Sequence, residues 1–204
     1  MPKVKVPRKS TTVDMTAMCD VAFLLLTFFM LTSNFVAKEP IVVAIPASVA
    51  EIKIPERDIA TVLIDKEGKV FFGLDTQQDR KELLKTLGLA YAATIPAFDE
   101  KELNEFSKIS MSGVPIEKMH AFLALSPEKR DSKDAALGIP TDSLNNQFSA
   151  WMSNARKINP KLRLAIKADQ QTPYKVIKGV MSTLQKIKEN RYNLITSLKE
   201  VSTK

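Results

Sequence analysis

Asp20 lies inside an otherwise apolar stretch, and its position is the clearest sign of chemistry in the sequence. The stretch runs from Ala17 to Ala37, and between Val21 and Leu31 the only polar side chain is Thr27. A carboxylate there costs on the order of 3 kcal/mol on membrane-insertion scales, so such residues usually face a protein interior or an aqueous path. A carboxyl group held among apolar groups can alternate between its protonated and ionised forms. The pattern therefore predicts that Asp20 carries protons.

A single spanning helix cannot enclose a polar path, so Asp20 requires helices of a partner around it. Thr27 follows seven residues later, which is two helical turns and roughly 10 Å along the same face. We expect the two residues to form a sparse polar stripe toward that partner. Two alternatives stay open: Asp20 reaches the lipid headgroups at the near end of the span, and Thr27 bonds its own backbone, as threonine readily does in membrane helices.

The sequence offers few residues for metal binding, disulfide formation or enzymatic catalysis. The single cysteine, Cys19, excludes a disulfide framework and a multi-thiolate metal site, and the single histidine, His120, excludes chemistry that needs two imidazoles. The acidic cluster at residues 99–105 is interpreted as the solvated start of a helix, and His120 as a structural residue. We expect no metal, no cofactor and no enzymatic activity.

The apolar stretch is predicted to be a transmembrane helix at residues 17–37. About 20 residues are enough to cross a hydrocarbon core of roughly 30 Å. Four basic side chains lie within residues 3–9, whereas only Lys38 follows closely. The positive-inside rule therefore places residues 1–16 in the cytoplasm and the rest of the chain on the other side. A cleaved signal peptide is disfavoured because a cut after Ala37 would need a small residue at position 35.

The net charge of +7 over 204 residues is unevenly distributed. Residues 34–155 hold 14 basic and 18 acidic side chains, a sum of −4, and residues 156–204 hold 12 basic and 3 acidic, a sum of +9. The basic block lacks the interleaved aromatic residues expected of a single-strand nucleic-acid binder. Nucleic acid is therefore not expected as a partner, whereas a lipid surface or an acidic partner remains open.

The run from Asp14 to Met30 reads D-M-T-A-M-C-D-V-A-F-L-L-L-T-F-F-M. It resembles the N-terminal signature of the ExbD/TolR family of biopolymer transport proteins, and the ExbD branch most closely. Asp20 falls on the proton-carrying aspartate of that family, and Ala17 stands where the family often has proline. The resemblance implies the same role for Asp20 that its position in the apolar stretch predicts.

Two further segments resemble the family in the same order along the chain. V-A-I-P-A-S, from Val43 to Ser48, is similar to the family segment just outside the membrane, although Ala44 stands where the family often has aspartate. Its matched positions are Val43, Ile45 and Pro46. I-K-A-D-Q-Q-T-P-Y-K-V-I-K-G-V, from Ile166 to Val180, is similar to a segment of the family's outer domain. Its matched positions are Asp169, Pro173 and Tyr174.

The resemblance implies a function in the bacterial inner membrane. A homodimer of this chain would lie inside an oligomer of a multi-span ExbB/TolQ-like protein, with its C-terminal domain in the periplasm. Proton flow would move that domain, which would pass energy to a TonB-like protein for transport across the outer membrane. Two alternatives stay open: a TolR-like or other proton-driven motor, and a periplasmic binding module with an inert anchor, which the basic block would hold to cell wall or lipid.

Residues 59–204 predict a small α+β domain in which helices cover one face of a mixed sheet. Residues 59–73 read as two strands joined by a turn at Lys66 to Gly68. Residues 162–168 and 192–198 read as further strands. The prolines of residues 38–58 indicate an extended, flexible linker, with one strand-like patch at residues 41–45.

Three helices follow from the spacing of apolar residues. One is expected at residues 79–89, and another at residues 142–158 with Phe148 and Trp151 in the core. A third begins with Thr172 as its N-cap and Pro173 as its first helical residue. Residues 88–142 have no counterpart in the family and are expected to form a mostly helical insertion of about 55 residues.

Overall fold

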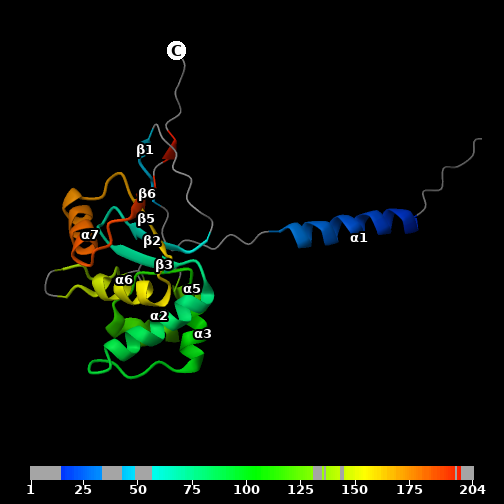
Figure 1. Cartoon of the computed structure of the whole chain (residues 1–204). Coiled ribbons are helices and arrows are strands. Elements are labelled where there is room, and N and C mark those ends of the chain that lie inside the picture. Colours follow the sequence, from blue (N-terminus) through cyan, green and yellow to red (C-terminus); the bar gives the residue numbers. More distant parts are fainter. Residues whose placement is uncertain are drawn as a thin grey trace, which may run out of the picture. The chain divides into compact units, whose positions relative to one another are not determined.

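The computed structural model describes residues 15–33, 43–48, 57–130, 135, 137–142, 145–195 and 197–198. They belong to two compact units, Met1–Ala37 and Lys38–Lys204, which are described separately. Figure 1 labels most of their helices and strands. The predicted cytoplasmic segment up to residue 14 and the linker residues 38–42 and 49–56 lie outside the described residues.

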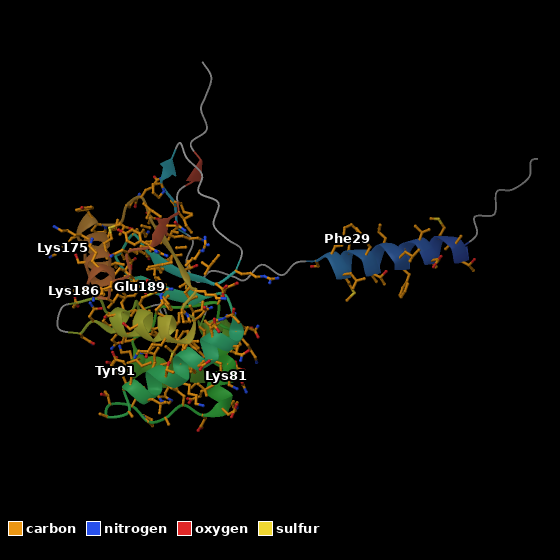
Figure 2. The ribbon with its side chains drawn as sticks, viewed as in Figure 1. Phe29, Lys81, Tyr91, Lys175, Lys186 and Glu189 are labelled. Atoms are coloured by element: carbon orange, nitrogen blue, oxygen red, sulfur yellow. The ribbon has the colours of Figure 1, made fainter. Side chains whose placement is uncertain are left out.

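Helix α1 spans Met15–Thr32, and its 18 residues contain neither glycine nor proline. At 1.5 Å per residue it is about 27 Å long, so its length and composition allow it to cross a membrane. Its side chains, among them Phe29, project from the helix on all sides (Figure 2), and only Thr27 is partly covered. The helix begins two residues before the predicted span, and the last four predicted residues, 34–37, lie outside the described part.

The second unit contains a five-stranded mixed sheet. Its strand order is β4-β3-β2-β5-β6, with β2 antiparallel to β3 and parallel to β5. The strands are β2 (Ile59–Ile64), β3 (Val70–Leu74), β4 (Met111–Ser112), β5 (Arg163–Ala168) and β6 (Tyr192–Leu194). The predicted hairpin of β2 and β3 is confirmed: the amide of Gly68 donates to the carbonyl of Asp65 at 2.9 Å. Gly68 has φ +80°, a backbone conformation that favours glycine.

Helices on one face of this sheet build the main core with it. The described helices of this unit are α2 (Gln77–Ala90), α3 (Glu100–Lys108), the 3₁₀ helix η1 (Ile116–Lys118), α4 (Met119–Ala124), α5 (Pro127–Arg130), α6 (Gln147–Ile158) and α7 (Tyr174–Lys186). All of them except α5 contribute buried residues to this core. Alternate residues of β2, such as Val62, share the core with Leu84 of α2 and Leu184 of α7. On the opposite face, Leu63 and Phe71 form a smaller apolar cluster. The predicted mixed α+β architecture is confirmed.

Two predicted helices are present with shifted bounds. The helix expected at residues 79–89 is α2, in which Leu83, Leu84 and Leu87 are buried whereas Leu89 is exposed. The helix expected from Asp142 begins only at Gln147, because the side chain of Asn146 accepts a hydrogen bond from the amide of Ser149 at 3.0 Å and caps it there. The predicted core position of Trp151 is confirmed, since its side chain is fully buried.

The predicted N-cap of α7 was wrong by one residue. Pro173 is the N-cap, and Tyr174 is the first helical residue. The hydroxyl of Thr172 instead donates to the carbonyl of Asp65 at 3.1 Å, in the turn after β2. The Thr172 side chain is thus bonded to a distant carbonyl, and α7 begins without a side-chain cap hydrogen bond.

Two strand predictions also need correction. The described part of the strand-like patch, residues 43–45, forms no strand, and the short strand β1 lies just beyond it at Ala47–Ser48. The last strand does not run unbroken through residues 192–198. It separates into β6 and β7 (Ser197–Leu198), and β7 pairs in parallel with β1 instead of continuing the main sheet.

The region from 88 to 142 contains α3, η1, α4 and α5, and it adds the edge strand β4 to the sheet. The helix start predicted at the acidic cluster is present as the start of α3, where Asp99 and Glu102 also form a capping box. His120 stacks on Phe98 with ring centroids 4.3 Å apart, and its Nδ1 lies 2.8 Å from Glu102 Oε1. His120 therefore connects two segments of this region, in keeping with its predicted structural role.

Candidate functional site

Asp20 is the only charged side chain of helix α1. Its neighbours Cys19 and Val21 are exposed, as Asp20 itself is. Nothing within the helix pairs with the carboxyl group, so a group outside the helix has to compensate its charge in a membrane. The arrangement presents one titratable carboxyl on an otherwise apolar surface.

Thr27 lies on the same side of α1 as Asp20, because seven residues complete almost two helical turns. Its hydroxyl donates to the carbonyl of Leu24 at 2.9 Å. Thr32 makes the equivalent bond to Phe28 at 2.8 Å. The hydroxyl hydrogen of Thr27 is thus used within the helix, and only its oxygen lone pairs remain for a partner.

The second unit brings the segment from Val43 to Ser48, which we call the linker motif, into contact with the motif that begins in β5, although 125 residues separate Ala44 from Asp169. Asp169 follows the last residue of β5, and its Oδ2 accepts a hydrogen bond from the amide of Ala44 at 2.9 Å. The amide of Gln170 donates to the carbonyl of Ala44 at 3.0 Å. The side-chain amide of Gln170 donates to the carbonyl of Ile45 at 3.2 Å. Three hydrogen bonds therefore hold the linker motif at the end of β5.

Asp169 also shapes its own turn. Its Oδ1 accepts a hydrogen bond from the amide of Gln171 at 2.9 Å. The bonds from the amides of Gln171 and Ala44 hold the pKa of the Asp169 carboxyl below its usual range, and the charge of Lys66 acts in the same direction. The ionised form of Asp169 is thus the form that holds the linker motif.

The other motif residues have distinct positions. Val43 packs against the apolar cluster of Leu63, Phe71 and Met111 on the helix-free face of the sheet. Ile45 and Pro46 are half-buried. Pro173 caps α7, where its fixed φ of −59° suits the turn from β5 into the helix.

Tyr174 begins helix α7 and is 74% exposed. A large side chain with that exposure makes little contribution to the core of its own chain. Asp169 and Tyr174, which belong to the same motif from Ile166 to Val180, therefore have different surroundings. Asp169 contacts the linker motif, whereas Tyr174 faces solvent.

The structure thus places Asp169 against the segment that carries Val43, Ile45 and Pro46, through the backbone of Ala44 and Ile45. Asp20 and Thr27 belong to the separate first unit. Gln170 was missed by the sequence reasoning, although it lies next to Asp169 in the matched motif. Ala44, where the family often has aspartate, contributes only its backbone amide and carbonyl, so this contact does not require an acidic side chain. In the described residues, no group of three histidine, cysteine or acidic residues is placed to hold a metal ion.

One apolar helix with a single carboxyl, joined to a mixed α+β domain, defines a protein with a candidate single-pass membrane anchor. The profile of biopolymer transport proteins ExbD/TolR matches residues 7–199, and the chain belongs to this family. It is similar to the biopolymer transport protein ExbD of Aquifex aeolicus (strain VF5), with 26% identity over 104 residues. That match covers 50% of this chain and 79% of the Aquifex protein. No solved structure matches the chain.

Proposed function

We propose that this chain is the proton-conducting subunit of an ExbB–ExbD-type motor in the bacterial inner membrane. The motor uses the proton motive force to energise TonB-dependent transport across the outer membrane. The observation that carries the proposal is Asp20, the single charged side chain of an apolar helix that is long enough to span a membrane. Membership of a family of biopolymer transport proteins supports it.

In this proposal, residues 1–16 are cytoplasmic and the C-terminal domain is periplasmic, since the basic residues precede the span. Two copies of α1 lie inside an oligomer of a multi-span ExbB/TolQ-like protein, which shields Asp20 from lipid. Protonation removes the charge of Asp20 and lowers the cost of passing an apolar surface of the partner. Release of the proton on the other side restores the charge, so each cycle favours a new position of the helix.

The linker motif offers a route from this movement to the C-terminal domain. Ala44 and Ile45 are hydrogen-bonded to Asp169 and Gln170, so a pull on the linker acts directly on the end of β5. β5 pairs with both β2 and β6. A force applied there reaches the centre of the sheet. A TonB-like protein that contacts the domain would receive the movement.

The proposal predicts that Asp20→Asn abolishes energy-dependent uptake through the outer membrane. Asparagine keeps the volume of the side chain and removes its titration. The measurement is uptake in cells that carry the variant as the only copy, at wild-type protein level. Cys19→Ser is the matched control, because it changes the adjacent exposed residue and leaves the carboxyl in place. Normal uptake by Asp20→Asn would overturn the proton-carrying role.

A TolR-like role in constriction of the cell envelope is the second candidate, because the matching family description names ExbD and TolR together. The phenotype of cells that lack the chain distinguishes the transport motor from the TolR-like role. Loss of uptake with normal division favours the transport motor, and defective constriction with normal uptake favours the TolR-like role. A third possibility, an inert anchor, predicts that a neutral leucine helix in place of α1 leaves every function intact.

A further inference from the structure

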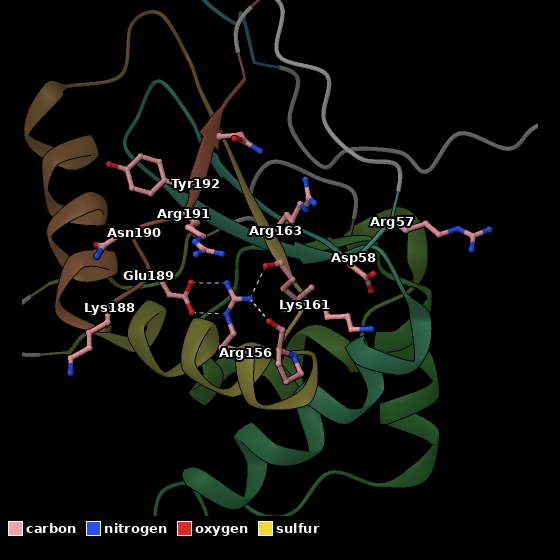
Figure 3. A pocket seen from close by; sticks show the side chains of 13 residues that line it. Arg57, Asp58, Arg156, Lys161, Arg163, Lys188, Glu189, Asn190, Arg191 and Tyr192 are labelled. Carbon is pink, nitrogen blue, oxygen red and sulfur yellow. Dashed lines mark hydrogen bonds and ion pairs between the residues drawn. The ribbon is translucent and has the colours of Figure 1, made fainter.

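A basic pocket lies at the start of β5, at the other end of this strand from Asp169. It is lined by Arg57, Lys161, Arg163, Lys188 and Arg191, and we refer to these five residues as the basic pocket. Its volume is about 1200 Å³. Figure 3 shows Lys161, Arg163 and Arg191 around the floor of this pocket. The floor is formed by Arg156 and Glu189, which face each other.

The ion pair on the floor neutralises one acidic side chain of the pocket. Arg156 Nε lies 2.5 Å from Glu189 Oε1, and Nη2 lies 2.6 Å from Oε2. The other acidic side chain, Asp58, accepts a hydrogen bond from Asn159 at 2.7 Å. The lining therefore holds six basic and two acidic side chains, a net charge of +4 (6 − 2). Within the described part of the chain, none of the five basic-pocket residues has an ion-pair partner.

The backbone around the pocket is held in place by the same arginine. Arg156 Nη1 donates to the carbonyls of Pro160 at 2.9 Å and Leu162 at 2.7 Å. Its salt bridge to Glu189 ties this turn to the loop that carries Lys188 and Arg191. All five basic-pocket side chains are exposed, and Arg57 and Lys188 extend outward on opposite sides of the view in Figure 3. Like charges grouped around one hollow repel one another, and a bound anion relieves that repulsion. The net positive charge of the lining therefore favours a ligand with several negative charges.

We propose that the basic pocket binds an acidic segment of a partner polypeptide. Guanidinium groups match the geometry of carboxylates, which they bind with two parallel hydrogen bonds. The volume exceeds the roughly 300–1,000 Å³ of most small-molecule pockets, so the site suits a chain segment better than a single ion. The amides of Asn190 and Asn193 line the same space and offer partners for peptide groups. A flat bilayer surface fits such a hollow poorly.

The site is separate from the contact of the linker motif. Five residues of β5 lie between Arg163 of the basic pocket and Asp169, a distance of about 20 Å along an extended strand. An acidic segment can therefore bind while Asp169 holds Ala44. The inference does not rest on the proposed motor function, because it needs only the charges and the shape of this pocket.

The test uses the full chain in nanodiscs of neutral phosphatidylcholine and a fluorescent hexaglutamate peptide, with fluorescence anisotropy as the readout. We expect binding that weakens as salt rises. The double variant Arg163→Gln with Arg191→Gln should raise Kd about tenfold or more, since it removes two charge-assisted contacts. The matched control, Lys175→Gln with Lys178→Gln, removes the same charge from exposed positions of α7, where Lys175 projects outward (Figure 2). This control should change Kd less than about twofold.

Several outcomes would overturn the inference. They are no binding by the wild-type chain, equal weakening by the pocket and control variants, and binding that the pocket variant does not change. Stronger binding of phosphatidylglycerol vesicles than of the peptide, through the same two arginines, would assign the pocket to lipid instead. Displacement of the peptide by pyrophosphate at equal charge concentration would assign it to small anions. Fluorescence of Trp151, the single tryptophan and fully buried, verifies that each variant is folded.

Discussion

Asp169 shows how a single carboxylate can connect two distant segments of the chain. Its two oxygens accept hydrogen bonds from Ala44 and Gln171, one from the linker motif and one from its own turn. Both bonds require an acceptor and favour the ionised form, which is why the pKa of Asp169 lies below its usual range. The residue is therefore expected to make attachment of the linker motif depend on pH.

Attachment of the linker motif should weaken in acid. A group whose pKa is lowered by folding contributes stability above its unfolded pKa, about 3.9 for aspartate, and loses this contribution as pH falls through the lower folded pKa. As the pH falls from above about 3.9 through the lower folded pKa of Asp169, hydrogen exchange of the Ala44 amide should accelerate relative to that of the β2 amides. Asp169→Asn should remove the pH dependence. Equal protection of Ala44 across this range in the wild-type chain would contradict the assignment.

At the residue scale, the sequence identifies Asp20 and Asp169 but not what they contact. Asp20 stands out because a charge in an apolar run is costly. The contact between Asp169 and Ala44 uses the backbone of Ala44 across 125 residues, so no spacing of side chains signals it. The hydroxyl of Thr172 shows the same limit, since its partner is the carbonyl of Asp65, 107 residues earlier in the chain.

At the element scale, close packing leaves no space for a side chain at Gly113, directly after β4. A Cβ there would lie 2.0 Å from Cδ1 of Phe71, whose ring is fully buried on the helix-free face. Gly113→Ala should therefore destabilise the domain by about 1–3 kcal/mol. The measurement is urea unfolding of the full chain in detergent, followed by fluorescence of Trp151.

The matched control is Gly179→Ala in the middle of α7. A Cβ at this position meets nothing within 4 Å. Alanine favours the helix over glycine, so this variant should stabilise the domain by about 0.5–1 kcal/mol. The two substitutions are chemically identical and are expected to have opposite signs. An unchanged unfolding midpoint for Gly113→Ala would show that Phe71 moves aside without cost.

The elements that were predicted well are those with a repeated pattern. The hairpin of β2 and β3 and the helices α2 and α6 each bury several residues at regular spacing, and this period is visible in the sequence. The strands β1, β4 and β7 have two residues each, too few to show any period. Their positions depend on pairing partners that only the folded chain supplies.

At the scale of the whole molecule, the average composition conceals two local extremes. The average resembles that of a soluble basic protein, but α1 is a strongly apolar stretch and residues 156–204 carry a net charge of +9. The basic pocket draws four of its five cations from residues 156–204. Membership of the ExbD/TolR family relates the two units to one function in biopolymer transport.

A measurement of proton flux tests most directly whether Asp20 carries protons through the membrane. The chain is reconstituted into liposomes with its multi-span partner, a membrane potential is imposed, and the internal pH is followed with a dye. We predict a flux for the wild-type chain, and for Asp20→Asn a fall to the level of liposomes that contain the partner alone. A flux of wild-type size through the Asp20→Asn complex would contradict the account.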